Sequence, residues 1–209
     1  PIDANIVQGT MKDQEQKTYK TVTLGTQTWM AENLNTSKYN DGTTISEVTD
    51  ATSWKEANNG AYCYHDNDDS NEPKYGKLYN WYAVETGKLC PTGWHVPSQE
   101  EWETLESYLI DNDFGLGVDE NIAKALASNS SWTNSDVENV VGNDLSSNNR
   151  TGFNAQPGSY RGFGANFMST KNYAMFWTAT SKDSEYAYYN GLYYYEPTLQ
   201  QTADGKTFG

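Results

Sequence analysis

The chain has 209 residues, of which 28 are acidic and 14 basic, so its formal net charge is −14. A surface this acidic repels phosphate groups, which argues against nucleic acid as a partner, and no apolar run approaches the roughly 20 residues of a membrane helix, which argues against membrane insertion. Aromatic residues make up 14% of the chain, enough to fill a core, so we do not expect disorder.

The first elements in chain order are strands. Residues 1–18 are polar and predict a leader or linker with a short strand at 5–7, and the start at Pro1 rather than Met indicates a processed N-terminus. Alternating apolar residues at 19–24 and 27–30, separated by Gly25-Thr26, predict a β-hairpin. Residues 35–60 predict an irregular surface stretch, 61–64 a short strand and 75–83 an aromatic core element.

A helix is predicted over residues 97–110. Ser98 and Glu101 have the spacing of a capping box, in which each side chain bonds the other residue's backbone N–H. The apolar residues that follow at helical spacing form one core-facing stripe: Trp102, Leu105 and Leu109. A second, shorter helix is predicted over 120–128, with Asp119 as its N-cap.

The last third of the chain is expected to be β. Residues 176–181 predict a strand, and 186–195 hold six tyrosines around Asn190-Gly191, which predicts a hairpin with a two-residue turn. Two helices among short antiparallel strands and long irregular loops indicate an α+β fold.

The tyrosine-rich segment is the leading candidate binding site. In a strand, successive side chains point to opposite faces, so tyrosines line both faces and one face should meet solvent or a ligand. Exposed tyrosine offers a large and stiff contact surface, and aromatic rings stack on the C–H faces of sugars; the alternative is a tyrosine-rich core sheet. The candidate ligand-binding residues are Trp177, Tyr186, Tyr188, Tyr189, Asn190, Tyr193, Tyr194 and Tyr195.

An acidic loop at residues 66–72 resembles the start of a calcium-binding loop, because oxygen-bearing side chains recur at alternate positions. Asn71 replaces the glycine of an EF-hand loop, and Lys77 stands where the bidentate glutamate should be. We therefore favour a solvated turn. Calcium is the only cofactor we consider, and its candidate ligands are Asp66, Asp68, Asp69 and Glu72.

Catalytic and cysteine motifs are scarce. His95 is the best lone catalytic histidine, but its neighbours Trp94 and Val96 favour a packed structural role, and we assign no catalytic residue. Cys63 and Cys90 lack zinc-site spacing. They form either one disulfide, as in secreted proteins, or two buried thiols.

Long ordered motifs run through most of the chain. They lie at 24–34 (LGTQTWMAENL), 60–64 (GAYCY), 75–83 (YGKLYNWYA), 90–98 (CPTGWHVPS), 151–161 (TGFNAQPGSYR) and 176–180 (FWTAT). Together they resemble the Fibrobacter succinogenes major paralogous domain over about residues 19–209. The resemblance implies a C-type-lectin-like fold, related to formylglycine-generating enzymes and retroelement variable proteins, in a secreted or surface-anchored bacterial module.

The sequence departs from the pattern that the resemblance implies in three respects. It has no cysteine near the C-terminus, where the oxidising enzymes of the related branch carry theirs, which argues against an enzyme. The family continues past Gly209 into a final strand with a third cysteine, so this strand is expected to be trimmed or supplied by a partner. The calcium signature of the lectins, Glu-Pro-Asn followed by Trp-Asn-Asp, is not met at Glu72-Pro73 or Glu196-Pro197. A calcium-bridged sugar site is therefore not expected.

These observations lead to one main hypothesis about function. We expect a single domain over 19–209 that acts as a non-catalytic binding module, extracellular or on the bacterial cell surface, with a polysaccharide or a protein as its ligand. One alternative is a structural or adhesive subunit of a surface filament, completed by strand addition and capable of self-assembly. Another alternative is a surface hydrolase that uses acidic residues near His95.

Overall fold

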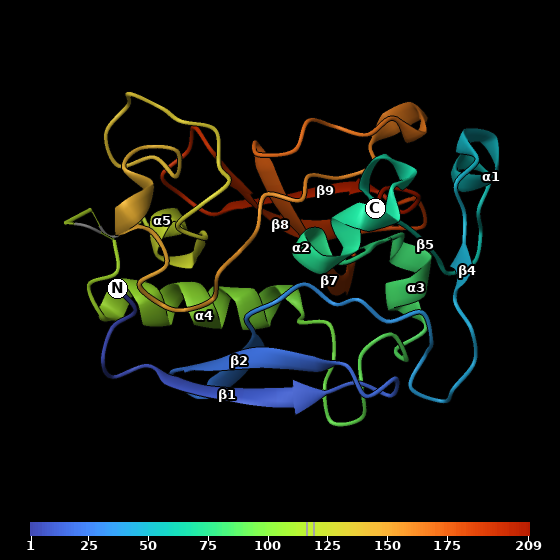
Figure 1. Ribbon diagram of the computed structural model, residues 1–209, viewed down its shortest axis with the longest axis horizontal. Helices are drawn as coiled ribbons and strands as arrows, with labels where there is room; N and C mark the ends of the chain where they lie inside the picture. Colours follow the sequence, from blue (N-terminus) through green and yellow to red (C-terminus); the bar gives the residue numbers. More distant parts are fainter. Residues whose placement is uncertain (116, 119) are drawn as a thin grey trace.

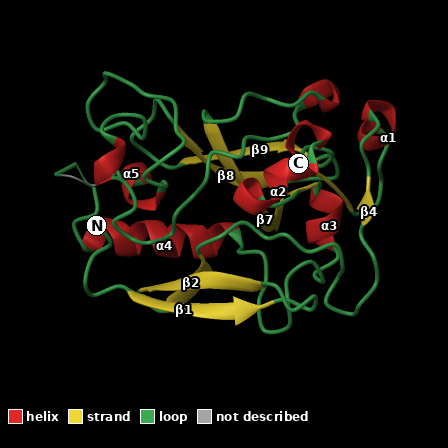
Figure 2. Cartoon of the chain, viewed as in Figure 1, coloured by secondary structure: helices red, strands yellow, loops and turns green. Residues whose placement is uncertain are grey.

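A computed structural model describes residues 1–115, 117–118 and 120–209. Its core is organised by small sheets, and most of the connecting chain is irregular (Figures 1 and 2). The strands are β1 (Val7–Lys12), β2 (Thr18–Leu24), β3 (Gln27–Met30), β4 (Ser46–Glu47), β5 (Ala61–Cys63), β6 (Leu78–Tyr79), β7 (Tyr173–Ser181), β8 (Tyr186–Tyr193) and β9 (Gln200–Gly205). The α-helices are α1 (Ala51–Lys55), α2 (Glu72–Tyr75), α3 (Trp81–Glu85), α4 (Gln99–Asp111) and α5 (Ala123–Leu126). The 3₁₀ helices are η1 (His65–Asn67), η2 (Asp69–Asn71), η3 (Leu145–Ser147) and η4 (Phe163–Ala165).

The N-terminal sheet has the strand order β1-β2-β3 and is antiparallel. The predicted hairpin is confirmed, with Leu24 paired to Gln27 across the turn. Gly25 has a φ of 62°, and a Cβ there would lie 2.9 Å from the Tyr108 ring, so only glycine fits. β1 lies in the segment that we interpreted as a leader; its strand begins at Val7, where the predicted one ends.

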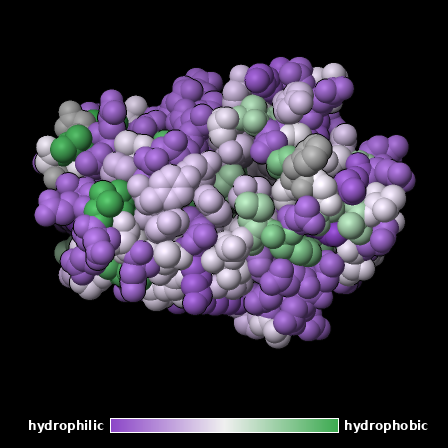
Figure 3. All heavy atoms as spheres, turned by 90° about the horizontal axis from the view of Figure 1, so that it is seen from above, coloured by the Kyte–Doolittle hydropathy of each residue, from purple (hydrophilic) through white to green (hydrophobic). Residues whose placement is uncertain are grey.

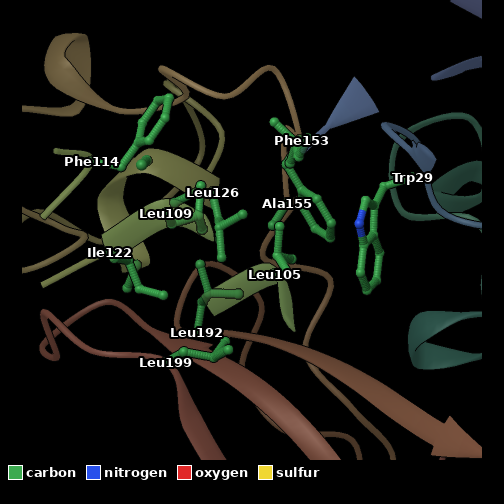
Figure 4. Packing of buried hydrophobic residues seen from close by; sticks show 14 of the residues in the cluster. Trp29, Leu105, Leu109, Phe114, Ile122, Leu126, Phe153, Ala155, Leu192 and Leu199 are labelled. Atoms are coloured by element: carbon green, nitrogen blue, oxygen red, sulfur yellow. The ribbon is translucent and has the colours of Figure 1, made fainter. Parts of the chain in front are cut away.

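Helix α4 joins this sheet to the C-terminal one, and lies between them in Figure 1. The predicted capping box is present in both directions: Glu101 N donates to Ser98 Oγ at 3.2 Å, and Ser98 N donates to Glu101 Oε2 at 2.7 Å. The predicted stripe is buried, and it forms one core with residues from both sheets and the following loops (Figure 4). Members of this core include Val22, Trp29, Trp102, Leu105, Leu109, Phe153, Ala174 and Leu192.

The C-terminal sheet has the order β7-β8-β9, and here the hairpin prediction is wrong. Residues 186–193 form one continuous central strand, in which Asn190 pairs with Phe176 of β7 and with Gln201 of β9. Neither Asn190 nor Gly191 has the positive φ that a type I′ turn needs. Both are buried, because a middle strand is covered on both edges and both faces.

The expectation of an α+β, C-type-lectin-like fold with two helices is also wrong. Helices make up 20% of the structure and strands 26%, in three small sheets, and no two-helix lectin fold is present in the described residues. The second predicted helix, 120–128, is reduced to the short helix α5, and Ile122 and Leu126 are buried. Its predicted N-cap, Asp119, lies outside the described residues. Ala127 has already left helical geometry, with a ψ of 145°, and Ala127 bridges to Ala155.

The third sheet, β4-β5-β6, is held by a buried arginine. The guanidinium of Arg161 donates to the carbonyls of Val48 and Thr49, each at 2.8 Å. It lies 4.7 Å from the ring centre of Trp54 and 4.9 Å from that of Phe167. Cation–π contact and charge-assisted hydrogen bonds together satisfy a charge that is 1% exposed.

The face of the molecule in Figure 3 is mainly hydrophilic, with small hydrophobic patches. This agrees with the mean hydropathy of −0.84. Among the described residues, none of the helices has the length and apolar character that crossing a membrane requires.

Candidate functional site

One face of the β7–β8 pair carries a row of aromatic side chains. Trp177 lies opposite Tyr189, and Tyr173 lies opposite Tyr193, so all four share this face. The Trp177 and Tyr189 rings are 6.2 Å apart at 89°, and the Tyr173 and Tyr193 rings are 5.3 Å apart at 86°. Such edge-to-face pairs are the arrangement that aromatic quadrupoles favour.

Gly191 makes this row possible. A Cβ at this position would lie 2.9 Å from the Tyr193 ring and 3.0 Å from the sulfur of Met175. Because glycine has no Cβ, the side chains of Tyr189 and Tyr193 can approach each other across this position, and their hydroxyls lie 3.3 Å apart. The glycine that we interpreted as a turn residue therefore serves a close approach of side chains.

The other tyrosines of the predicted site do not join this row. Tyr186 and Tyr188 project from the opposite face of β8, together with the fully buried Asn190. Tyr194 and Tyr195 follow the strand, and Tyr195 contacts Tyr193 with 5.7 Å between ring centres. Tyrosines thus occupy both faces of β8, as predicted, but they form no single binding face.

A cavity of about 550 Å³ lies beside the aromatic row. Segments distant in the sequence meet around it: 26–34, 75–79, 93–97, 153–160, β7 and the end of the chain from 204 to 209. Of the predicted ligand-binding residues, Trp177 and Tyr189 line it, while Tyr186, Tyr188, Asn190, Tyr193, Tyr194 and Tyr195 do not. Its size is typical of ligand sites, which span roughly 300–1,000 Å³.

Two buried polar groups in the cavity wall have no hydrogen-bond partner among the described residues. They are the hydroxyl of Ser159, which is 3% exposed, and the indole N–H of Trp102, which is 1% exposed. Ser159 also has a φ of 65°, an uncommon conformation for a non-glycine residue. Unpaired buried donors are costly in a folded protein.

Asp204 contributes a carboxylate to the same cavity. Burial raises its pKa above the usual value, against a hydrogen bond from the backbone N–H of Gly205 that lowers it. No signal in the sequence marks this residue, because Ala203-Asp204-Gly205 has the composition of a turn. Only the pairing of β9 with β8 brings Asp204 to the aromatic row.

His95 and Glu101 lie at the rim of the cavity. His95 Nε2 is 2.8 Å from Glu101 Oε1, and 69% of the histidine side chain is exposed, so the predicted packed role of His95 is wrong. Burial would raise the pKa of Glu101, but hydrogen bonds from Ser98 and His95 lower it below its usual value. Both oxygens of this carboxylate are thereby engaged.

The acidic loop does not gather its carboxylates. Asp66 lies 3.3 Å from His65 Nε2, Asp68 accepts from the N–H of Ser70, and Glu72 turns to the ammonium groups of Lys17 and Lys77, at 3.2 and 3.3 Å. In the part of the chain that the structure describes, no three His, Cys, Asp or Glu side chains come together in a metal-binding group. The predicted calcium ligands Asp66, Asp68, Asp69 and Glu72 therefore form no common site.

Both cysteines are free thiols, so the disulfide alternative is not realised. Burial raises the pKa of Cys63 to about 11 and that of Cys90 to about 12. Thiols with such high pKa values stay protonated at neutral pH and are poor nucleophiles. We therefore assign both cysteines a structural role.

A family model described as the Fibrobacter succinogenes major domain matches residues 22–205. The chain belongs to this family. The match confirms the family resemblance that the sequence motifs indicated. The matched range contains the aromatic row and Asp204. No curated protein and no solved structure matches the chain. Because the description of the family carries no activity, the function must be inferred from the site.

Proposed function

We propose that this domain is a non-catalytic ligand-binding module of a secreted or surface-anchored bacterial protein, and that it holds a saccharide unit in the aromatic cavity. The observation that carries the proposal is the perpendicular pair of Trp177 and Tyr189 in the wall of a cavity of about 550 Å³. Aromatic walls with a few polar groups are typical of small-molecule sites.

The polar groups of the cavity suit a polyhydroxyl ligand. The Asp204 carboxylate can accept hydrogen bonds from sugar hydroxyls. Hydrogen bonds from a saccharide would stabilise this partly buried carboxylate.

Binding without turnover is the simplest use of this site. A glycosidase needs one carboxylic acid to protonate the leaving group and a second carboxylate as base or nucleophile. Hydrogen bonds from Ser98 and His95 favour the ionised form of Glu101, and these two bonds engage both of its carboxylate oxygens. Glu32 is the other carboxylate among the described residues that line the cavity, but it is exposed and accepts from the backbone N–H of Lys20, so its environment differs from that of Asp204. This difference favours a binding role.

The test is a binding screen with matched variants. Trp177→Leu and Tyr160→Leu each remove one ring from the cavity wall, whereas Tyr186→Ala removes a 43%-exposed ring from the opposite face of β8. We expect the first two to weaken retention on the recognised polysaccharide at least about tenfold and the third to leave it unchanged. Equal retention by all three, with unfolding midpoints near that of the wild type, would contradict the proposal.

A further inference from the structure

We propose that the ligand carries an ammonium group, and that the carboxylate of Asp204 and the rings of Tyr189, Trp177 and Tyr160 receive it at one end of the cavity. This inference rests on the proposed function, because it specifies the class of saccharide bound at the same site.

The sheet register places these groups together. Tyr189 lies opposite Trp177 of β7 on one side and opposite Thr202 of β9 on the other. Asp204 stands two residues further along β9, so it shares the face of Tyr189. Its direct neighbour across the strands is Ala187. Asp204, Tyr189, Trp177 and Tyr160 all line the cavity.

Asp204 has no counter-ion of its own. None of the ion pairs among the described residues includes it. The nearest basic residue in sequence, Lys206, places its ammonium 4.4 Å over the ring centre of Trp81 instead. A half-buried carboxylate without a cation is a cost that a cationic ligand group would remove.

The rings near Asp204 stay neutral and present electron-rich faces. Burial is the main cause that raises the pKa of Tyr160 and of Tyr189, and the negative charge of Asp204 adds to it in both. The same charge thus acts on two rings from different segments, 160 and 189. Carboxylate and aromatic faces attract an ammonium group together, and recognition of organic cations by aromatic cages uses this combination.

The charge of the whole chain acts in the same direction. A net charge of −14 attracts cations and repels anions at long range. Acidic polysaccharides are consequently poor ligands for this domain, whereas amino sugars are favoured both at long range and within the cavity.

The experiment uses β-1,4-linked tetramers of glucosamine, N-acetylglucosamine and glucose, which differ only in the substituent at C2. Affinity is measured by calorimetry at about pH 6, where the amine is protonated. We expect the wild type to bind the glucosamine tetramer at least about tenfold more tightly than the other two. Asp204→Asn should remove this preference. Glu103→Gln, which neutralises an exposed carboxylate on α4, should retain it.

Two results separate this inference from the proposed function. If the wild type binds all three tetramers equally and Trp177→Leu weakens all of them, saccharide binding stands and the ammonium inference is overturned. If no tetramer binds, the saccharide proposal fails, and choline is compared by NMR titration with its neutral analogue 3,3-dimethylbutan-1-ol. A choline response that Asp204→Asn abolishes would support the cation site, and equal responses to the two probes would overturn it.

Discussion

The indole of Trp177 stands at 89° to the ring of Tyr189, and its N–H donates to the carbonyl of Tyr79 at 3.1 Å. The hydrogen bond fixes the plane of the indole, and the edge-to-face contact holds the Tyr189 ring against it. Both residues come from a sheet whose central strand is buried, so the aromatic row is rigid before any ligand arrives. Preorganisation of this kind reduces the entropic cost of binding.

Gly191→Ala should destabilise the fold by about 1–3 kcal/mol, because the added methyl group would press on Tyr193 and Met175 at 2.9 and 3.0 Å. Urea unfolding measures the change. Gly205→Ala is the matched control in neighbouring β9, since the closest atom to its Cβ would be 3.4 Å away. If both variants unfolded at the same urea concentration, the close approach of side chains at Gly191 would not contribute to the free energy of unfolding.

Arg161→Lys should lower the free energy of unfolding by about 2–4 kcal/mol, although the charge is kept. Arg161 donates from three separate nitrogens to the carbonyls of Ala165, Val48 and Thr49, whereas lysine offers a single nitrogen. Lysine also lacks the planar face that contacts Trp54 and Phe167. Arg150→Lys serves as the control, because Arg150 makes an exposed hydrogen bond to the Asp113 carbonyl. A loss as large in the control would refute the special role of Arg161.

Glu101→Gln should destabilise the protein at neutral pH and much less in acid. Hydrogen bonds from Ser98 and His95 outweigh burial and lower the folded-state pKa of Glu101 below its ordinary value of 4.5. Its contribution is therefore fully present above about pH 4.5 and is lost as the pH falls through the lower, folded-state pKa. Thermal unfolding of both proteins at pH 7 and pH 3 measures this difference. A gap in midpoint that does not narrow in acid would contradict the assignment.

Asp204→Asn should stabilise the unliganded protein slightly while it impairs the proposed site. Burial raises the folded-state pKa of Asp204, so ionisation costs more in the folded than in the unfolded state, and this penalty is present at neutral pH and disappears as the pH falls below the unfolded-state value. Solvent screening limits the gain to less than about 1 kcal/mol. A lower thermal midpoint for the variant at pH 7 would show that the carboxylate serves the fold.

Ellman's reagent should find both cysteines unreactive in the native protein and two free thiols after denaturation. Cys63 is buried, and burial raises the pKa of both cysteines, so both thiols stay protonated at neutral pH. A reducing agent should leave the thermal midpoint unchanged. Fewer than two thiols in denaturant without reductant would indicate a disulfide and contradict the structure.

Short-range patterns were predicted well, because the interactions that decide them span only a few residues. The capping box of Ser98 and Glu101 closes within one helical turn, and the hairpin at Gly25-Thr26 closes within two residues. The apolar stripe of α4 follows from helical periodicity alone. The family motifs are also local strings, so family membership could be inferred from them.

The sequence by itself therefore determined the family, the N-terminal hairpin, helix α4 and the aromatic character of the C-terminal segment. Only the tertiary structure decided which face each tyrosine takes, that Gly191 answers a close approach of side chains, and that Asp204 joins Trp177 and Tyr189 at one cavity. These properties depend on the pairing of β8 with β7 and β9, which joins residues as far apart in sequence as Trp177 and Tyr189 or Ala187 and Asp204. A local pattern cannot specify such pairings, because the same Asn-Gly dipeptide suits both a turn and a crowded central strand.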